Sequence, residues 1–302
     1  MTTKESEKNL VVVQLSGGND ALNTVIPYGD NLYYDNRPFV YIAEENILRI
    51  DNYLGFNPGM SALKKLYDEG SVAVINGIGY PEPNRSHFRS MDIWHTAETK
   101  SIINEGWLGR TIRELDPKAE NVLTGVNFGR GLPRSLYAKD VPVASVGDLG
   151  TYGLFPDIED DEARNVALSA FSQMYGGLGK DTMANFFSQT GRDAMKGADI
   201  LRRASMMYKS SIEYSDNSIS QSMKSIAQVM FADLGTRVFY AQHGSYDTHS
   251  GEIASHQKLW KDLSVGLSDF MDDLREHGRA KDTIIFLFSE FGRRVKENGG
   301  GT

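Results

Sequence analysis

Four short, continuously apolar runs constrain the fold of this 302-residue chain more than any other feature. They cover residues 10–15, 72–76, 237–240 and 283–288, and they are rich in β-branched and aromatic residues. Strands that are buried on both faces have this pattern, whereas strands with one solvated face alternate apolar and polar residues. The four runs therefore predict strands of a largely parallel sheet that helices cover on both sides.

Helical patterns lie between these predicted strands. Residues 58–69 place apolar side chains at helical spacing and end at Gly70, and residues 253–277 carry a long apolar stripe. Strands that alternate with helices indicate an α/β fold, here a three-layer sandwich around a doubly wound sheet. A length of 302 residues fits one large domain, so we expect residues 1–302 to form a single unit.

The middle of the chain has a different character. Residues 157–233 are mostly helical in pattern, polar and rich in methionine, and they open on the acidic stretch 157–162. Acidic residues are favourable in the first turn of a helix, so this stretch needs no functional explanation. We interpret residues 157–233 as a helical insertion or lid on the same domain.

Composition excludes several classes of function. The formal net charge is −8, which disfavours a nucleic-acid partner because phosphate binding needs a basic surface. The chain has no cysteine, which removes disulfides, thiolate metal sites and cysteine nucleophiles. We expect no transmembrane segment, because no apolar run reaches 18 residues, and the polar N-terminus shows no export signal.

The residues after each predicted strand are the candidates for a functional site, because ligands bind outside the carboxyl ends of the strands in open α/β sheets. Two glycines and then Asn19 and Asp20 follow the first run. They form either a ligand-binding turn or a plain glycine turn in which Asp20 caps the next segment. The second run leads to Arg85, Ser86 and His87. Ser86 is either a nucleophile or only the cap of a helix.

The third and fourth runs are followed by stronger candidates. Asp247, His249 and His256 come after the third run, and aspartate oxygens and histidine nitrogens suit zinc, manganese and similar ions. His256 also precedes the apolar stripe of a helix, so it could instead be a packed, hydrogen-bonded side chain. Glu290 ends the fourth run, where a carboxylate needs a partner. That partner is either a metal or Arg293, through a salt bridge.

Several motifs together resemble one protein family. They are Leu15-Ser16-Gly17-Gly18-Asn19-Asp20-Ala21-Leu22-Asn23-Thr24-Val25-Ile26-Pro27, Arg37-Pro38, Arg85-Ser86-His87-Phe88, Gly106-Trp107-Leu108-Gly109-Arg110, Asp247-Thr248-His249-Ser250 and Ser289-Glu290-Phe291-Gly292-Arg293. With them the chain resembles the bacterial domain-of-unknown-function 1501 family from about residue 10 to residue 302. That family is grouped with the alkaline phosphatase and sulfatase-like superfamily, so the resemblance implies an alkaline phosphatase-like sandwich.

The superfamily resemblance also implies roles for single residues. Its enzymes cleave phosphate or sulfate esters with a serine or threonine nucleophile beside one or two metal ions. By position, Asp20 resembles the metal ligand after the first strand, and Asp247 with His249 resembles an Asp/His metal pair. Ser86 takes the nucleophile's position.

Two departures from the family pattern stand near the end of the chain. Glu290 occupies the place of an aspartate, and Phe291 that of a histidine, which argues against a full two-metal site. Members of the family continue with an Asp-His-Gly element, so the resemblance implies that this chain is truncated at its C-terminus. Many members carry an export signal, which implies a periplasmic or exported protein.

The predicted function is metal-dependent hydrolysis of phosphate or sulfate esters. The predicted metal ligands are Asp20, Asp247, His249, His256 and Glu290. Ser86 and His87 would be catalytic, and Asn19, Arg85 and Arg293 would bind the substrate. We expect zinc as the metal, with manganese, calcium and magnesium as alternatives, and a small anionic ester or a sulfated or phosphorylated glycan as substrate. The alternative is a non-catalytic binding or export-associated protein that keeps the fold.

Overall fold

The computed structural model describes residues 8–149, 160–176, 191, 197–198, 200–201 and 204–302. The strands are β1 (Asn9–Leu15), β2 (Val25–Ile26), β3 (Leu48–Arg49), β4 (Gly55–Phe56), β5 (Gly125–Phe128), β6 (Ala144–Val146), β7 (Val238–His243) and β8 (Thr283–Ser289). The α-helices are α1 (Asn31–Asn36), α2 (Ser61–Asp68), α3 (His87–Thr96), α4 (Trp107–Leu115), α5 (Asp161–Gly176), α7 (Ser218–Phe231) and α8 (Glu252–Glu276). Short 3-10 turns are η1 (Glu44–Asn46), η2 (Pro58–Met60), η3 (Arg134–Leu136) and η4 (Ala280–Asp282).

A five-stranded sheet in the order β6-β5-β7-β1-β8 forms the centre of the molecule. Every neighbouring pair in it is parallel. The central strand β1 carries Val11, Val12 and Val13, which are fully buried because both faces of the sheet are covered. The predicted parallel α/β sheet is therefore confirmed, and three of the four predicted strands form β1, β7 and β8.

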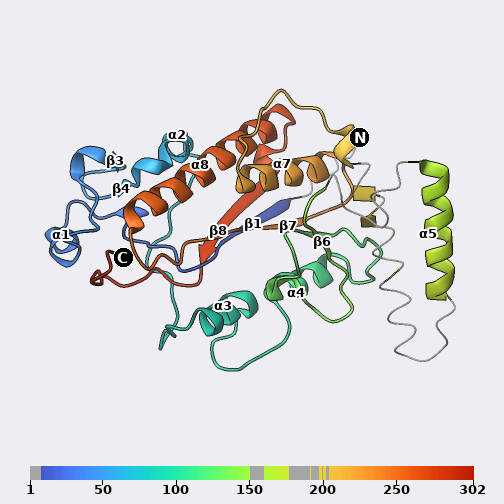
Figure 1. Cartoon of the computed structure of the whole chain (residues 1–302), viewed down its shortest axis with the longest axis horizontal. Coiled ribbons are helices and arrows are strands. Elements are labelled where there is room, and N and C mark those ends of the chain that lie inside the picture. The colour runs from blue at the N-terminus through green and yellow to red at the C-terminus, as the bar shows by residue number, and fades with distance from the viewer. Residues whose placement is uncertain (1–7, 150–159, 177–190, 192–196, 199, 202–203) are drawn as a thin grey trace, which may run out of the picture.

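Helices lie on both faces of this sheet, as Figure 1 shows. The helices α2, α7 and α8 pack on one face, where side chains such as Leu66, Met223 and Phe270 join the largest hydrophobic cluster. The helices α3 and α4 cover the other face, where Leu108 and Trp94 pack against residues of β1, β7 and β8. The molecule is thus a three-layer sandwich, which is the predicted architecture.

The remaining predicted strand, at residues 72–76, is absent from the sheet. Residues 72–76 form no strand and join no sheet, and the side chains of Val74 and Ile75 are 37% and 73% exposed. The apolar run favours a buried strand, but β-branched residues only favour extended backbone and do not supply a hydrogen-bonding neighbour. The predicted strand at residues 72–76 is therefore not formed in this structure.

A small antiparallel sheet, β2-β4-β3, extends the chain beyond the carboxyl end of β1. It stands beside α1, and Ile26, Tyr33 and Ile47 form a separate hydrophobic cluster there. Tyr33 donates its hydroxyl proton to Asn23 Oδ1 at 2.7 Å, which ties α1 to the segment after β1. This subregion therefore holds the loop after β1 in place.

The predicted helical insertion over residues 157–233 is described only in part. Helices α5 and α7 fall within it, and α7 packs on the central sheet through Ile219 and Met223. Much of the segment between these two helices lies outside the described residues. No helix in the described part of the chain combines the length and apolarity that a membrane span requires.

Candidate functional site

The loops after three neighbouring strands begin side by side at one edge of the sheet. In the register of the sheet, Leu15 at the end of β1 stands opposite both His243 of β7 and Ser289 of β8. Because the strands are parallel, their carboxyl ends meet there, and the following loops leave from the same edge. Distant segments of the chain therefore converge at one rim of the sheet.

Two glycines let these loops approach one another closely. Gly17 has φ +117° and Gly18 has φ +73°, both in the left-handed region that disfavours other residues. A Cβ on Gly17 would lie 2.3 Å from the backbone nitrogen of Asp247. One on Gly18 would lie 2.2 Å from the ring of Phe291. The glycines after β1 thus make room for the loops after β7 and β8.

Glu290 is the buried anchor of the rim, with only 3% of its surface exposed. Its Oε1 accepts a hydrogen bond from the Gly17 backbone at 3.0 Å and lies 2.9 Å from His87 Nδ1. Its Oε2 accepts from the Ser289 hydroxyl at 3.0 Å. The carboxylate at the end of β8 therefore has partners, as its burial requires, but they are not the predicted Arg293.

Asp247 joins the rim through three basic groups. Its Oδ1 lies 2.8 Å from Arg293 Nη2 and 3.5 Å from His87 Nε2, and its Oδ2 lies 3.2 Å from His249 Nε2. Its side chain is 42% exposed, so this part of the rim faces solvent. We call the set of His87, Asp247, His249, Glu290 and Arg293 the open cluster.

Arg293 holds the backbone of the open cluster together. Besides Asp247, its guanidinium donates to the carbonyl oxygens of Gly18, Tyr246 and Thr248 at 2.8–3.0 Å. Those carbonyls belong to the loops after β1 and β7. A five-donor guanidinium suits such a junction, because it can satisfy several acceptors at once. Arg293 therefore fixes loop geometry as well as contributing positive charge.

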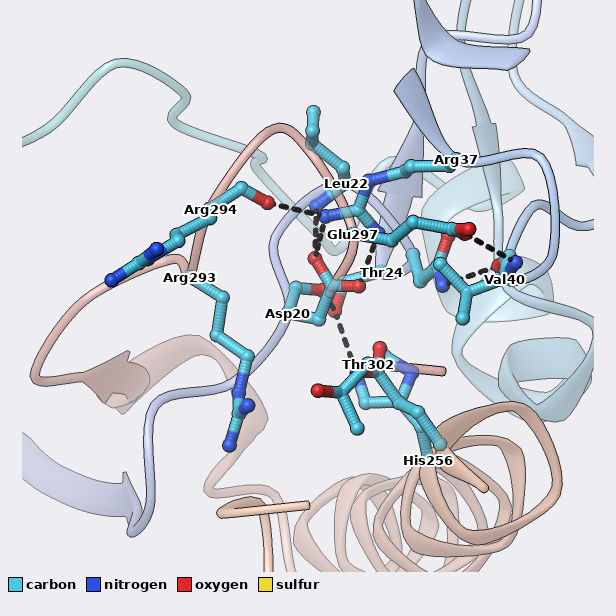
Figure 2. Close-up of polar contacts among 12 residues, drawn as sticks. Asp20, Leu22, Thr24, Arg37, Val40, His256, Arg293, Arg294, Glu297 and Thr302 are labelled. Carbon is cyan, nitrogen blue, oxygen red and sulfur yellow. Dashed lines mark hydrogen bonds and ion pairs between the residues drawn. The ribbon is translucent and has the colours of Figure 1, made fainter. Parts of the chain in front are cut away.

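A second cluster lies behind the first and is buried. Asp20 forms a two-pronged ion pair with Arg37, at 2.5 and 2.9 Å, and both side chains are 3% exposed. Arg37 also donates to the carbonyl oxygens of Arg294 and Val295. Figure 2 shows Asp20 facing Arg37, with His256 and Thr302 on its other side. Asp20 is thus neutralised by an arginine.

Glu252 completes this buried cluster from the first turn of α8, and it is 1% exposed. Burial and a hydrogen bond with Asp20 raise the pKa of Glu252 to about 8. Burial alone would raise the pKa of Asp20 too, but the hydrogen bond from Glu252 and the pair with Arg37 outweigh it, so that pKa lies below its ordinary value. The Asp20–Glu252 pair therefore carries one proton at neutral pH.

The two clusters touch through Thr248. Its hydroxyl lies 3.4 Å from Glu252 Oε2, and its carbonyl accepts from Arg293. His256 lies one turn along α8 from Glu252, with Nε2 3.1 Å from Asn19 Oδ1. Burial lowers the pKa of His256 to about 4, so the ring is neutral. This is the packed, hydrogen-bonded histidine that the sequence left open as an alternative.

Asn19 sits inside the buried cluster and not on its surface. Its Oδ1 accepts from Trp260 Nε1 at 3.0 Å, and its side-chain amide donates to Thr24 at 3.0 Å. With 8% of its surface exposed, it orders the loop after β1. The structure therefore places it behind the surface that the open cluster presents to solvent.

Ser86 and Arg85 lie on the exposed segment that leads into α3. Ser86 is the N-cap residue of α3, but its hydroxyl makes no capping hydrogen bond. The next residue, His87, is the one that enters the open cluster. In the described part of the chain, no side-chain hydrogen bond or ion pair joins Ser86 or Arg85 to the five residues of that cluster. Their catalytic and substrate-binding roles remain predictions.

The donor types at the rim suit a divalent ion, but their present arrangement does not enclose one. Among the described residues, no group of three or more histidine, aspartate or glutamate side chains is placed to hold a metal. The five predicted ligands divide between the two clusters: Asp247, His249 and Glu290 lie in the open one, and Asp20 and His256 in the buried one. In the open cluster the donors hydrogen-bond one another instead.

Sequence reasoning missed two residues of this region. Arg37 stands in the sequence analysis only as part of a motif, and Glu252 is not among its candidates. An acidic residue in a first helical turn is ordinary on an exposed helix. Only the burial of that turn in the structure shows that the charged form of Glu252 is costly. The signal that could have found Arg37 is Asp20 itself, since a buried carboxylate demands a partner.

The shared proton of the buried pair predicts a pH dependence. Glu252 has a folded-state pKa raised to about 8, so its contribution to stability is present at low pH and is lost as the pH rises. Relative to a Glu252→Gln variant, the wild type should lose about 2 kcal/mol of unfolding free energy between pH 6.5 and 8.5. Urea unfolding with a chelator present measures this difference.

The comparison with Glu252→Gln removes the contribution of the histidines. His95, His243 and His256 all have pKa values lowered to about 4 by burial, so they stabilise the fold as the pH rises from 4 to 7. They are common to both proteins and cancel in the difference. Parallel pH profiles for the two proteins would show that Glu252 is not protonated in the folded state.

Comparison with known proteins places the chain in a family. A search of curated proteins and a search of solved structures each returned no match. A family model described as "Protein of unknown function (DUF1501)" matches residues 77–302. The matched region holds the whole open cluster, together with Glu252 and His256 from the buried one. It covers well over half of the chain, and the chain therefore belongs to the DUF1501 family.

Proposed function

We propose that the open cluster binds a divalent metal and hydrolyses phosphate or sulfate esters. The observation that carries the proposal is the position of His87 between two carboxylates. Buried Glu290 faces Nδ1 at 2.9 Å, and Asp247 faces Nε2 at 3.5 Å. A carboxylate that orients one nitrogen of a histidine while the other nitrogen is free for a ligand is the usual support for a metal-binding imidazole.

Three side chains offer the donor atoms for such an ion. They are His87 through Nε2, Asp247 through a carboxylate oxygen, and His249 through Nε2. Asp247 lies 3.5 and 3.2 Å from the two nitrogens, separations that a small side-chain rotation could convert into joint coordination. Two histidines and one carboxylate are a ligand set that zinc takes at catalytic sites, with a further position left for water or substrate.

The surrounding residues suit an anionic substrate. Arg293 brings positive charge to the rim, and exposed Arg85 and Ser86 precede His87 on the same segment. A bound metal would stabilise negative charge on the substrate and lower the pKa of a coordinated hydroxyl or water. Glu290 keeps His87 in one orientation, Arg293 holds the anionic group, and Ser86 is the candidate nucleophile. Small anionic esters and sulfated or phosphorylated glycans fit these charges.

A second candidate is a binding protein without turnover. Asp20, which the superfamily resemblance makes a metal ligand, is instead neutralised by Arg37. The ring of Phe291 lies tilted against that of His87, with centroids 4.7 Å apart, where the resemblance expects a histidine. A rim with one incomplete metal site would still bind anions. Both candidates include an exported, periplasmic protein as the resemblance implies.

Metal analysis of the full chain tests the proposal. After dialysis against zinc or manganese, we expect about one ion per chain, and at least a tenfold weaker affinity after His87→Ala, Asp247→Ala or His249→Ala. The control is His277→Gln, which removes a histidine far from the rim. Turnover of aryl phosphate or aryl sulfate should accompany metal binding and disappear in Ser86→Ala.

The outcomes separate the two candidates. Metal binding with ester turnover supports the hydrolase, and metal or anion binding without turnover on any ester supports the binding protein. Loss of turnover in His87→Ala but not in Ser86→Ala would leave the metal site standing and assign the nucleophile to water. Unchanged metal affinity in all three rim variants would refute the site.

A further inference from the structure

One edge of the central sheet is uncovered. Strand β8 pairs with β1 on one side, and no strand lies on its other side in the described part of the chain. Its side chains Ile284 and Phe286 are 63% and 39% exposed. A seven-residue edge strand with apolar side chains in solvent invites another strand, and proteins usually protect such an edge.

An extended apolar segment of the same chain is also without a partner. Residues 72–79 form no strand or helix, and within the described residues their backbone makes no hydrogen bond. Val74, Ile75 and Ile78 are 37%, 73% and 62% exposed. Extended backbone rich in β-branched residues is what a sheet edge accepts. Residues 72–79 and the free edge of β8 therefore both lack a strand to pair with.

The path of the segment follows that of β8. It begins after Glu69, which pairs with Arg275 near the C-terminal end of α8, at the amino edge of the sheet where β8 also begins. It ends before His87, which contacts Glu290 at the carboxyl edge. Residues 72–79 thus run from the amino edge to the carboxyl edge, in the direction of β8.

Figure 1 shows the same path in space: the chain leaves α2 on one face of the sheet and reaches α3 on the other, passing on the β8 side. The chain must cross between the layers there, and a strand is the ordinary way for an α/β fold to do so. Val72 already packs against the large hydrophobic cluster, together with Ile285 and Leu287 of β8.

We infer that residues 72–77 add to β8 as a sixth, parallel strand of the central sheet. Side chains alternate between faces along a strand, so Val72 on the face of Ile285 and Leu287 puts Ile75 on the face of Ile284 and Phe286. Docking would bury these three exposed side chains beside Phe288, whose ring already stacks on Phe286. The pairing is specific because the side chains of the segment and of β8 alternate between the same two faces of the sheet.

The added strand has a consequence for the rim. Its carboxyl end would lie beside that of β8, so the loop from Gly77 to Ser86 would start at the edge where the open cluster lies. Docking would thereby anchor the segment that carries Ser86 and His87. This inference concerns the fold of the segment and stands whether or not the proposed hydrolase activity is correct.

The absence of cysteine allows a direct test by engineered disulfides. Ile75→Cys combined with Phe286→Cys, or with Ile284→Cys for a register two residues away, should form an intramolecular bond in most chains under mild oxidation. The matched control combines Ile75→Cys with Leu287→Cys, which is equally near in sequence but faces the other side of the sheet. Non-reducing electrophoresis and peptide mapping report the bonds.

Each outcome decides the proposal. An intramolecular bond in a face-matched pair and not in the control supports it. Equal bonding in both, no intramolecular bond, or only bonds between two chains overturns it, the last by making β8 an interface between copies. Hydrogen exchange of the unmodified protein is independent of folding defects in the variants. Amides of residues 73–77 that exchange at the rate of a free chain, without protection on the order of 100-fold in alternate residues, also overturn it.

Discussion

Replacement of Arg37 by methionine should lower the free energy of unfolding by about 3–5 kcal/mol. Arg37 and Asp20 are each 3% exposed, and the guanidinium is the cation that holds the Asp20 carboxylate. Methionine keeps most of the side-chain volume, so the loss comes from an unpaired buried charge and from the freed carbonyls of Arg294 and Val295. Urea unfolding at pH 7 measures the change.

Two further variants show whether the buried charge is the cause. Arg49→Met removes a similar pair with Glu44, but those side chains are 62% and 52% exposed, so it should cost less than about 1 kcal/mol. Asp20→Asn in the Arg37→Met background should recover part of the stability, because it removes the orphaned charge. A double variant less stable than Arg37→Met would show that Asp20 has another stabilising partner.

The pair Asp20–Arg37 also explains why the rim separates into two clusters. An aspartate already paired with an arginine and sharing a proton with Glu252 has little charge left to attract a metal. Asp247 keeps its exposure and lies between two imidazoles. The buried cluster therefore supports the loops, and the open cluster is the part of the rim that can meet a ligand.

Strands β1 and β8 of the sheet could be predicted from sequence because each is a continuous apolar run rich in β-branched or aromatic residues. Three consecutive valines in β1 and the run Ile284-Ile285-Phe286-Leu287-Phe288 in β8 both favour extended backbone strongly. Strands β5 and β6, only four and three residues long, have no such run and were not predicted. They are strands because β7 offers an edge to β5 and β5 in turn offers one to β6, which is a tertiary cause.

The site was predictable as a location but not as a network. Parallel strands bring their carboxyl ends together, so the meeting of Gly17, Asp247 and Glu290 follows from topology. Which side chain pairs with which does not. Glu290 takes His87 where Arg293 stood as its expected partner, and Arg293 takes Asp247, because the choice depends on loop packing within a few ångströms.

Gly17→Ala is expected to be the most damaging small substitution at the rim. The new methyl group would stand 2.3 Å from the backbone nitrogen of Asp247, in a residue with φ +117°. Backbone cannot move aside as a side chain can, so the loops after β1 and β7 would have to separate. Strain and overpacking together should cost about 3 kcal/mol or more, measured by urea unfolding.

Gly131→Ala separates the clash from the cost of the backbone angle. Gly131 has φ +77°, and its Cβ would meet nothing within 4 Å, so this variant should cost only about 1–2 kcal/mol. Gly17→Ala should in addition break the hydrogen bond from its backbone to Glu290 and release His87. The NMR chemical shifts of the His87 ring should then change in Gly17→Ala and stay unchanged in Gly131→Ala. Equal losses of stability and unchanged His87 ring signals in both variants would mean that the close approach of these loops does not hold the rim together.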